Sequence, residues 1–193
     1  TMWSQDKPQP QRRLALDLAD LVTLLPTPAN FLTFMDAFWE TMRREWPGVD
    51  NLRMDKFLFL VRQYVNAGFA YVARDGWKDT ETRGKYLDVL RKVPLNPRDP
   101  KVPNGLRFHV VDVFVDEVEK VAGEGAPYDE LLGVLREVQE KTQVKSLRVR
   151  VKDALDDDRV REWMGEEKEG EDGEEEDSEE EEEADGEWGG FDD

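Results

Sequence analysis

The sequence predicts an all-α protein, built from antiparallel helix pairs stacked as an α-solenoid of the HEAT or armadillo kind and followed by a disordered acidic tail. Apolar residues recur at helical spacing from Leu14 to Val138, and no strand pattern interrupts them. Turns rich in proline and glycine separate the helical segments at intervals of roughly 20–25 residues, which suit a stacked superhelix. Almost all of the net charge lies in the last part of the chain.

The distribution of charge divides the chain into two parts. The 193 residues have a formal net charge of −18, and 18 of the 45 acidic residues lie in Glu166–Asp193, with only one of the 27 basic residues. The rest is therefore almost neutral. We expect residues 1–164 to form a helical-repeat domain that is part of a longer domain. Residues 165–193 form an acidic tail, and charge runs of this kind are usually disordered.

Composition argues against most kinds of chemistry. The chain has no cysteine, which excludes disulfides, thiolate zinc sites and cysteine nucleophiles. His109 is the only histidine and has no supporting catalytic motif, so we expect it to be a satisfied structural residue. Asp112, Asp116 and Glu117 share helical spacing, which a solvated helix face explains better than a cation site. We therefore expect no catalytic, cofactor or metal site, no small-molecule substrate and no membrane partner.

The first helix is expected to begin at Pro8, with Asp6 as its cap, because proline suits the first helical turn and aspartate accepts from free amides. Pro26 and Pro28 should end this run. Its apolar face consists of aliphatic residues at helical spacing: Leu14, Leu18, Leu21, Val22 and Leu25.

The second helix is expected to have Asn30 as its cap and a wide apolar face from Phe31 to Met42. The turn Trp46-Pro47-Gly48 should end it, because the residue before proline avoids the helical region. We predict that the Trp46 ring is structural and that its turn sets the angle between two central helices. We also predict that Gly48 adopts a backbone conformation that is costly for other residues.

The third helix should be the longest, running from Leu52 to about Ala73 with Asp50 as its cap. It is apolar nearly all round, which is typical of a central helix buried by its neighbours. Asp75-Gly76 should end it, and Asp79 or Thr80 should begin the fourth helix.

The second half of the chain begins with a proline-rich connector, Pro94–Pro103. The segment from Leu106 to Val121 is rich in β-branched residues, but its helical spacing continues too long for a strand, which usually has about 5–6 residues. Pro127 opens a further helix, and a last, weaker helix spans roughly Val144–Met164. Seven helices are therefore predicted.

Two basic clusters are candidates for contact with RNA or a partner. Arginine beside an aromatic ring is typical of phosphate and base-stacking contacts. The alternative is that these cations favour helix dipoles or pair with nearby carboxylates. Since the domain is nearly neutral, protein partners are favoured over strong nucleic-acid binding. The first cluster comprises Arg43, Arg44, Trp46, Arg53, Lys56 and Arg62, and the second comprises Lys145, Arg148, Arg150 and Lys152.

The tail ends in EWGGFDD, in which Trp188 and Phe191 are large apolar residues surrounded by acid. We interpret them as anchors of a short motif that docks on a basic, aromatic-lined surface, with the charges steering the encounter. The acidic run is also a candidate mimic of RNA that covers a basic surface until assembly.

Three blocks of the sequence resemble the nucleolar ribosomal RNA processing protein 1 family. They are MWSQDKP from Met2, FWETMRREWPGVDNLRMDKFLFLVRQYV from Phe38, and PNGLRFHVVDVFVDEVEKV from Pro103, in the same order as in the family. The resemblance covers about Met2 to Val138 and ends before the acidic tail, so it implies nothing about the tail.

The resemblance implies a non-enzymatic ribosome biogenesis factor of the nucleus and nucleolus. Members of the family are required for pre-ribosomal RNA processing in precursors of the large ribosomal subunit. They associate there with other assembly factors, among them a β-propeller protein and a Brix-domain protein, and with pre-ribosomal RNA. The alternative is an acidic-tailed chaperone for a basic client, either a ribosomal protein or a histone, in which Glu166–Asp193 would be needed for binding.

Overall fold

The structure, a computed structural model, describes residues 2–4 and 7–165. Over these residues the chain forms eight α-helices, two short 3-10 helices and no strand, which confirms the predicted all-α class. The predicted cap Asp6 and the whole acidic tail lie outside the described residues. The α-helices are α1 (Pro8–Asp20), α2 (Pro28–Glu45), α3 (Asn51–Ala73), α4 (Thr80–Lys92), α5 (Asn104–Val121), α6 (Tyr128–Lys141), α7 (Lys145–Leu155) and α8 (Asp158–Met164). The 3-10 helices are η1 (Leu21–Leu24) and η2 (Trp46–Gly48).

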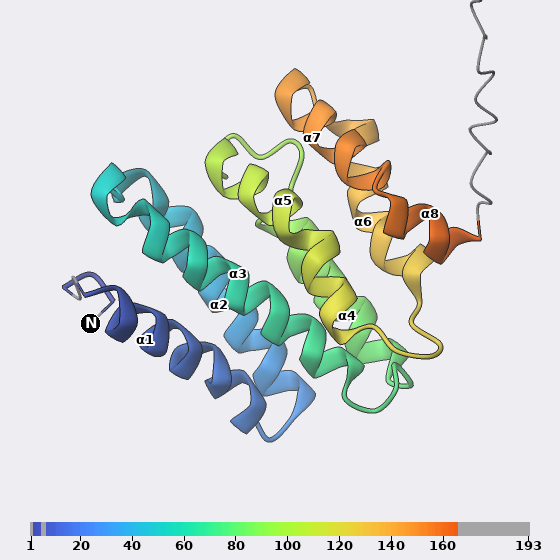
Figure 1. Cartoon of the computed structure of the whole chain (residues 1–193), viewed down its shortest axis with the longest axis horizontal. Helices are drawn as coiled ribbons and strands as arrows, with labels where there is room; N and C mark the ends of the chain where they lie inside the picture. The colour runs from blue at the N-terminus through green and yellow to red at the C-terminus, as the bar shows by residue number, and fades with distance from the viewer. Residues whose placement is uncertain (1, 5–6, 166–193) are drawn as a thin grey trace, which may run out of the picture.

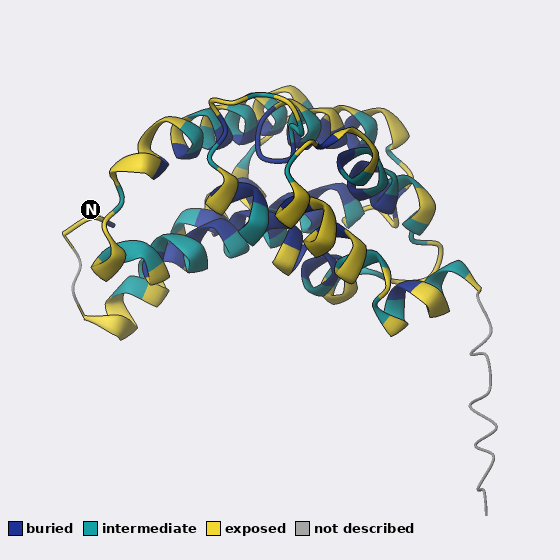
Figure 2. Ribbon diagram, turned by 90° about the horizontal axis from the view of Figure 1, so that it is seen from above, coloured by how far each residue is buried: buried dark blue, intermediate teal, exposed yellow. Residues whose placement is uncertain are grey.

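The helices form two layers (Figure 1). Helices α1, α3, α5 and α7 lie side by side in one layer, and α2, α4 and α6 lie behind them. Consecutive helices from α1 to α7 run antiparallel, so the helices of one layer share a direction. Buried residues gather between the layers and exposed residues cover the outer faces (Figure 2). None of the helices formed by residues 7–165 is long and apolar enough to cross a membrane.

Aromatic rings connect α3 to helices of both layers. The Phe38 ring of α2 stacks on Tyr64 of α3 with 3.6 Å between centroids, and Phe69 of α3 meets Phe114 of α5 edge-on at 5.0 Å. The Tyr64 hydroxyl donates to the carbonyl of Leu18 in α1 at 3.1 Å, and burial raises the pKa of Tyr64 to about 12. Helix α3 therefore contacts α1, α2 and α5 through its own side chains.

Two of the predicted helix caps are confirmed. The Asp50 carboxylate accepts from the backbone N–H of Arg53 at 3.0 Å, and the Asp79 carboxylate accepts from that of Thr82 at 2.9 Å. Each bond satisfies one of the free amides at a helix start, and a cap of this kind contributes about 1 kcal/mol.

The predicted start of α2 is wrong by one turn. The Thr27 hydroxyl, rather than Asn30, caps this helix and accepts from the backbone N–H of Asn30 at 3.2 Å. Pro28 explains the difference, because its fixed φ suits the first helical position as well as it suits the end of the preceding run. Asn30 therefore lies inside the first turn.

The predicted single helix over Val144–Met164 is also wrong, and residues 7–165 form eight α-helices rather than the seven predicted. Helix α7 ends at Leu155. The Asp157 side chain then caps α8 by accepting from the backbone N–H of Arg159 at 2.9 Å. Aspartate competes for backbone amides in this way, so a run of three aspartates favours a new helix start over continuation.

Predictions concern two residues of the η2 turn, Trp46 and Gly48, and the structure differs from one of them. The Trp46 ring is buried as predicted, with 6% of its surface exposed, and it packs against the start of α5, where a Cβ on Gly105 would lie 3.2 Å from the indole nitrogen. Gly48 has no positive φ, and a Cβ at this position would meet nothing within 4 Å. The prediction of a strained Gly48 is therefore wrong, because η2 continues the right-handed helical path that any residue adopts.

Arg107 ties the backbone of the proline-rich connector to α5. Arg107 is 4% exposed, and its guanidinium donates to the carbonyl oxygens of Asn96 at 2.7 Å, Val102 at 2.6 Å, and Asp99. Burial lowers the pKa of Arg107. Charge-assisted bonds of this kind are roughly twice as strong as neutral ones, so the loop over Pro94–Pro103 is tied to α5 although it has no regular structure.

Helix α3 packs tightly against α4 at Gly68. A Cβ on Gly68 would lie 2.0 Å from the Tyr86 hydroxyl oxygen, and Tyr86 is fully buried. Position 68 therefore requires glycine, because Tyr86 fills the space that a larger side chain would need. The contact with Tyr86 offsets the low helix propensity of glycine.

We predict that Gly68→Ala lowers the free energy of unfolding by about 1–3 kcal/mol, as overpacking of a filled core does. Gly133→Ala in α6 is the matched control, since a Cβ there meets nothing within 4 Å. The control should gain up to about 1 kcal/mol from helix propensity. Chemical denaturation of both variants measures the difference, and equal effects would contradict the close-packing argument.

Candidate interaction surface

The first basic cluster lies at the end of α2 and along α3, and its members have internal partners. Arg43 binds Glu40 at 2.6 Å and lies 3.5 Å from Asp99, so the arginine joins α2 to the connector. Arg44 binds its neighbour Glu45 at 2.6 Å and remains mostly exposed, at 67% of its side chain. Of these two arginines, Arg44 is the more accessible to a partner.

Arg53 and Lys56 hold the start of the chain against α3. The Arg53 guanidinium pairs with Asp50 and lies 4.7 Å from the centre of the Trp3 ring. The Lys56 side chain is buried, and its ammonium donates to the Trp3 carbonyl at 2.9 Å. Both cations therefore have structural contacts. With Trp46 buried as well, the predicted role of this cluster in RNA contact stays a prediction.

Arg62, the last member of the first cluster, connects α3 to α5. Its guanidinium binds Asp116 at 2.9 Å and also binds Glu117, whose side chain is only 1% exposed. From the other side, Arg159 of α8 binds Asp116 at 3.0 Å and Glu119 at 2.6 Å. The acidic edge of α5 is thus bound by arginines from both sides. The prediction that Asp112, Asp116 and Glu117 form a solvated face is therefore wrong for Glu117, which is buried and bound by Arg62.

The second basic cluster lies on α7, the last long helix of its layer. Two residues of α7, Leu147 and Val151, are buried, and the other side chains are partly or fully exposed. We define the α7 face as its exposed cations with the apolar residue between them: Lys145, Arg148, Val149, Arg150 and Lys152.

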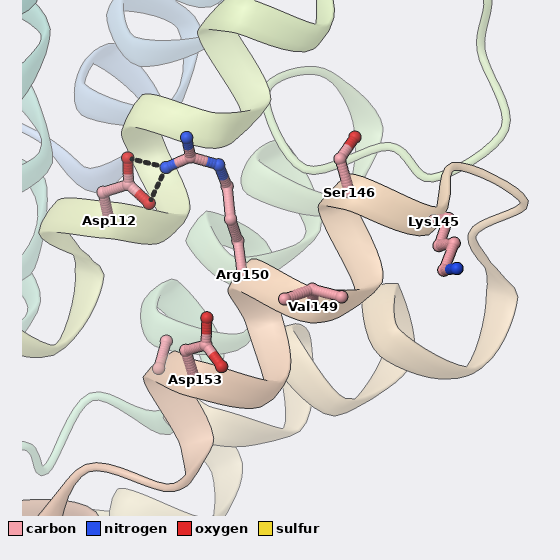
Figure 3. Close-up of a pocket in the computed structure, with 7 residues that line it drawn as sticks. Asp112, Lys145, Ser146, Val149, Arg150 and Asp153 are labelled. Carbon is pink, nitrogen blue, oxygen red and sulfur yellow. Dashed lines mark hydrogen bonds and ion pairs between the residues drawn. The ribbon is translucent and has the colours of Figure 1, made fainter.

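A shallow groove of about 1010 Å³ lies between the α7 face and α5. Figure 3 shows Arg150 reaching across it to Asp112, while Lys145 points away at the start of the helix. Val149 is 50% exposed along this groove. The groove therefore combines an exposed apolar side chain with charged groups at its edges.

The cations of α7 differ in how far they are neutralised. Arg150 binds Asp112 at 2.7 Å and lies over the Phe108 ring, 5.0 Å from its centre. Within the described residues Lys145 and Arg148 pair with no carboxylate; Arg148 donates instead to the backbone carbonyl of Thr142 at 2.6 Å. Lys152 comes only within 4.0 Å of Asp156. This helix therefore has positive charge that the described fold does not use.

The position of Lys145 and Arg148 is unfavourable for the helix itself. Both lie in the first turn of α7, and Val144 before them has no side chain that caps the free amides. Since a helix start carries partial positive charge, each cation there costs about 0.3–1 kcal/mol. The dipole and the two side chains add to one another, so this end of α7 attracts anions.

His109 lies on α5 beside a second groove, of about 470 Å³, formed with α1 and α3. Its Nε2–H donates to the Leu58 carbonyl at 2.7 Å, so the prediction of a satisfied structural histidine is confirmed. Burial lowers the pKa of His109 from its ordinary 6.5, and Arg62 adds to this, while the Leu58 hydrogen bond and Asp112 oppose it. Among the described residues, no three side chains of the metal-binding types converge on one site.

Sequence reasoning identified the cations of α7 but missed Val149, which lies between them. A signal was present, because Leu147 and Val151 define the buried stripe and a valine midway between them faces the opposite side. Arg150 was predicted without its partner, Asp112, which lies 38 residues away in sequence. Trp188 and Phe191 lie outside the described residues, so their role as anchors stays a prediction.

Comparison with known proteins gives one family and several relatives. The sequence model of the family described as nucleolar protein Nop52 matches residues 1–189. Human ribosomal RNA processing protein 1 homolog B is 42% identical over 122 residues, which are 63% of this chain and 16% of that protein. The human homolog A is 36% identical over 131 residues, 68% of this chain and 28% of that protein.

A more distant relative shows the same partial coverage. The ribosomal RNA processing protein 1 homolog of Caenorhabditis elegans is 32% identical over 140 residues, 68% of this chain and 35% of that protein. The chain thus spans between about a sixth and about a third of the length of these relatives.

We predict that the stability of the protein falls as the pH is lowered below 6.5, through the titration of His109. Its pKa is lower in the folded state than the ordinary 6.5, so the unfolded state takes up the proton first and gains stability as the pH falls. The loss of stability begins near pH 6.5, the ordinary pKa of histidine, and is complete at pH values below the pKa of His109 in the folded state.

Because the chain has one histidine, its folded pKa is measured directly by NMR titration of the ring protons. His109→Gln is the matched variant, since its amide can still donate to the Leu58 carbonyl and does not titrate. Its free energy of unfolding should vary less over this pH range than that of the wild type. A folded pKa at or above 6.5 would contradict the prediction.

Proposed function

The chain belongs to the nucleolar protein Nop52 family, and from this premise we propose that it is a non-enzymatic scaffold in nucleolar precursors of the large ribosomal subunit. Its relatives in human and worm are named ribosomal RNA processing proteins. That name supports a role in the processing of pre-ribosomal RNA, and the description of the family supports the nucleolus as its location.

The observation that carries the proposal is the two-layer stack of helices. We interpret it as an α-solenoid of the HEAT or armadillo kind, in which each helix pair contacts mainly its neighbours. A stack of this kind offers long, accessible faces, and the grooves described above are open ones between helices. Such surfaces suit the binding of several macromolecules better than the enclosure of one substrate.

The charge of the helical domain favours protein contacts over independent RNA binding. Residues 1–165 are almost neutral, and most arginines of the first cluster pair with carboxylates of the same chain. We propose other assembly factors as the main partners, among them the β-propeller and Brix-domain proteins that the family resemblance implies. Pre-ribosomal RNA is then contacted within the particle, through the α7 face and Arg44.

The two basic clusters require different tests. Reversing Lys56 or Arg62 would remove structural contacts, since Lys56 is buried and Arg62 binds Glu117, so a loss of function there would report on folding. Arg148 and Lys152 are exposed on α7 and have weak internal partners or none among carboxylates. They are the better probes of a binding surface.

We predict that the free chain binds pre-ribosomal RNA fragments weakly, with Kd in the tens of micromolar or worse at physiological salt, as nonspecific contacts do. The salt dependence should be shallow, since few phosphates are neutralised and each contributes about 0.9 to the logarithmic slope on duplex. A binding titration across salt concentrations measures both. Nanomolar, sequence-selective binding at physiological salt would overturn the scaffold proposal in favour of an independent RNA-binding protein.

We also predict that Arg148→Glu with Lys152→Glu reduces co-sedimentation with precursor particles several-fold while the melting temperature stays near that of the wild type. The control is Lys78→Glu with Lys85→Glu, which makes the same change in net charge on and near α4, away from α7. If both variants sediment as the wild type does, the α7 face is not a contact surface. If instead only neutralising Glu174–Glu183 releases the partners, the acidic-tailed chaperone explains the protein better.

A further inference from the structure

Three exposed cations of α7 are incompletely neutralised within the described residues. Lys145 and Arg148 pair with no carboxylate there, and Lys152 comes only within 4.0 Å of Asp156. Four of the eleven residues of α7 are basic and one is acidic. The first cluster provides the comparison, because Arg43, Arg53 and Arg62 all bind carboxylates of the described chain. What distinguishes α7 is therefore available charge rather than the number of basic residues.

The described part of the chain ends close to the carboxyl end of α7. Helix α8 ends at Met164, with Gly165 as its C-cap, and its residue Val160 packs with Val115 of α5 and Leu132 of α6. Ala154 and Leu155, at the end of α7, pack against the same cluster. Met164, at the end of α8, packs against this cluster too, so the last described residues lie near the carboxyl end of α7. The sequence that follows Gly165 has 18 acidic residues and one lysine.

We propose that the acidic run over residues 166–187 folds back onto the α7 face of the same molecule. Its carboxylates bind Lys145, Arg148 and Lys152. Binding stabilises Lys145 and Arg148 most, because these cations lie at the positive end of the helix dipole. This inference goes beyond the proposed function and does not depend on it, because it follows from the charges and positions of α7 and the acidic run alone.

The length of the run is sufficient for this contact. A helix of 11 residues is about 16 Å long, and five or six extended residues span that distance at roughly 3.3 Å each. Most of the run therefore remains to serve as the link from Gly165. Because acidic residues occur nearly throughout it, many registers satisfy the same cations.

Competition favours the attached run over loosely bound nucleic acid. A short flexible link gives an effective concentration of about 1 mM, so an intrinsic Kd of only about 0.1 mM would fill the face in about nine molecules out of ten. Nonspecific binding of RNA has a Kd of roughly 10⁻⁴–10⁻⁶ M and requires that concentration of free RNA. A tightly binding particle surface would still displace the run, which would make α7 accessible on assembly.

The test is carbodiimide crosslinking of the full chain, followed by mass spectrometry. This reagent joins a lysine amine to a carboxylate only where the two are in contact. Lys145 and Lys152 should crosslink to acidic residues of 166–187 at least about tenfold more often than Lys78, an exposed lysine with no ion pair in the described chain. The preference should vanish in 1 M salt, where the Debye length is about 3 Å. Equal crosslinking of all three lysines would overturn the proposal.

Two controls separate the alternatives. A mixture of unlabelled and ¹⁵N-labelled chains should give crosslinks within one isotope only, whereas mixed products would show contact between molecules and contradict a fold-back. Arg148→Glu should lower the crosslinks of Lys145 and Lys152 several-fold, and Lys78→Glu should leave them unchanged. If Lys145 and Lys152 do not crosslink to the run but are protected by an added pre-ribosomal RNA fragment, the face binds RNA and the proposal is wrong.

Discussion

The packing of α3 against neighbours on most of its sides is the constraint on which the rest of the structure depends. It contacts α1 and α5 within its layer and α4 behind it. A helix surrounded in this way can carry a charged side chain only where a neighbouring helix supplies the opposite charge. After Lys56, the one charged side chain of α3 is Arg62, which binds the carboxylates of α5. The close packing around α3 also limits the size of its side chains, and Gly68 leaves the space that Tyr86 fills. One helix thereby determines where its neighbours lie and which charges must be paired.

The pairing of charges extends this constraint across the layer. The acidic edge of α5 receives Arg62 from α3, Arg150 from α7 and Arg159 from α8. Exposed ion pairs contribute little individually, about 0–1 kcal/mol each, but here they also remove cations from the set available to a partner. The charge that α7 leaves available to a partner is therefore not visible from the sequence alone. It appears only after the internal pairs have been assigned.

The sequence was sufficient for the helices but not for the contacts between them. Periodicity predicted α1 to α6 because a buried helix repeats its apolar residues every three or four positions, and Asp50 and Asp79 were identified as caps because that interaction is local. The errors at Asn30, at Gly48 and in the division of α7 from α8 concern residues for which two local conformations are both favourable. The partners of Arg62 and Arg150 lie 54 and 38 residues away, so no local pattern specifies them.

The bonds of Arg107 to the connector have a consequence for experiments that require a label or an inserted peptide. Loops are usually chosen for this purpose because their backbone is free, but the carbonyls of Asn96, Asp99 and Val102 are bound to one buried guanidinium. A peptide inserted there would separate carbonyl acceptors that must remain close together. Whether a segment tolerates an insertion therefore depends on the hydrogen bonds of its backbone, and not on whether it is a loop. The exposed turn at Gly123–Gly125, which joins α5 to α6, is the better position for a fluorophore or an affinity tag.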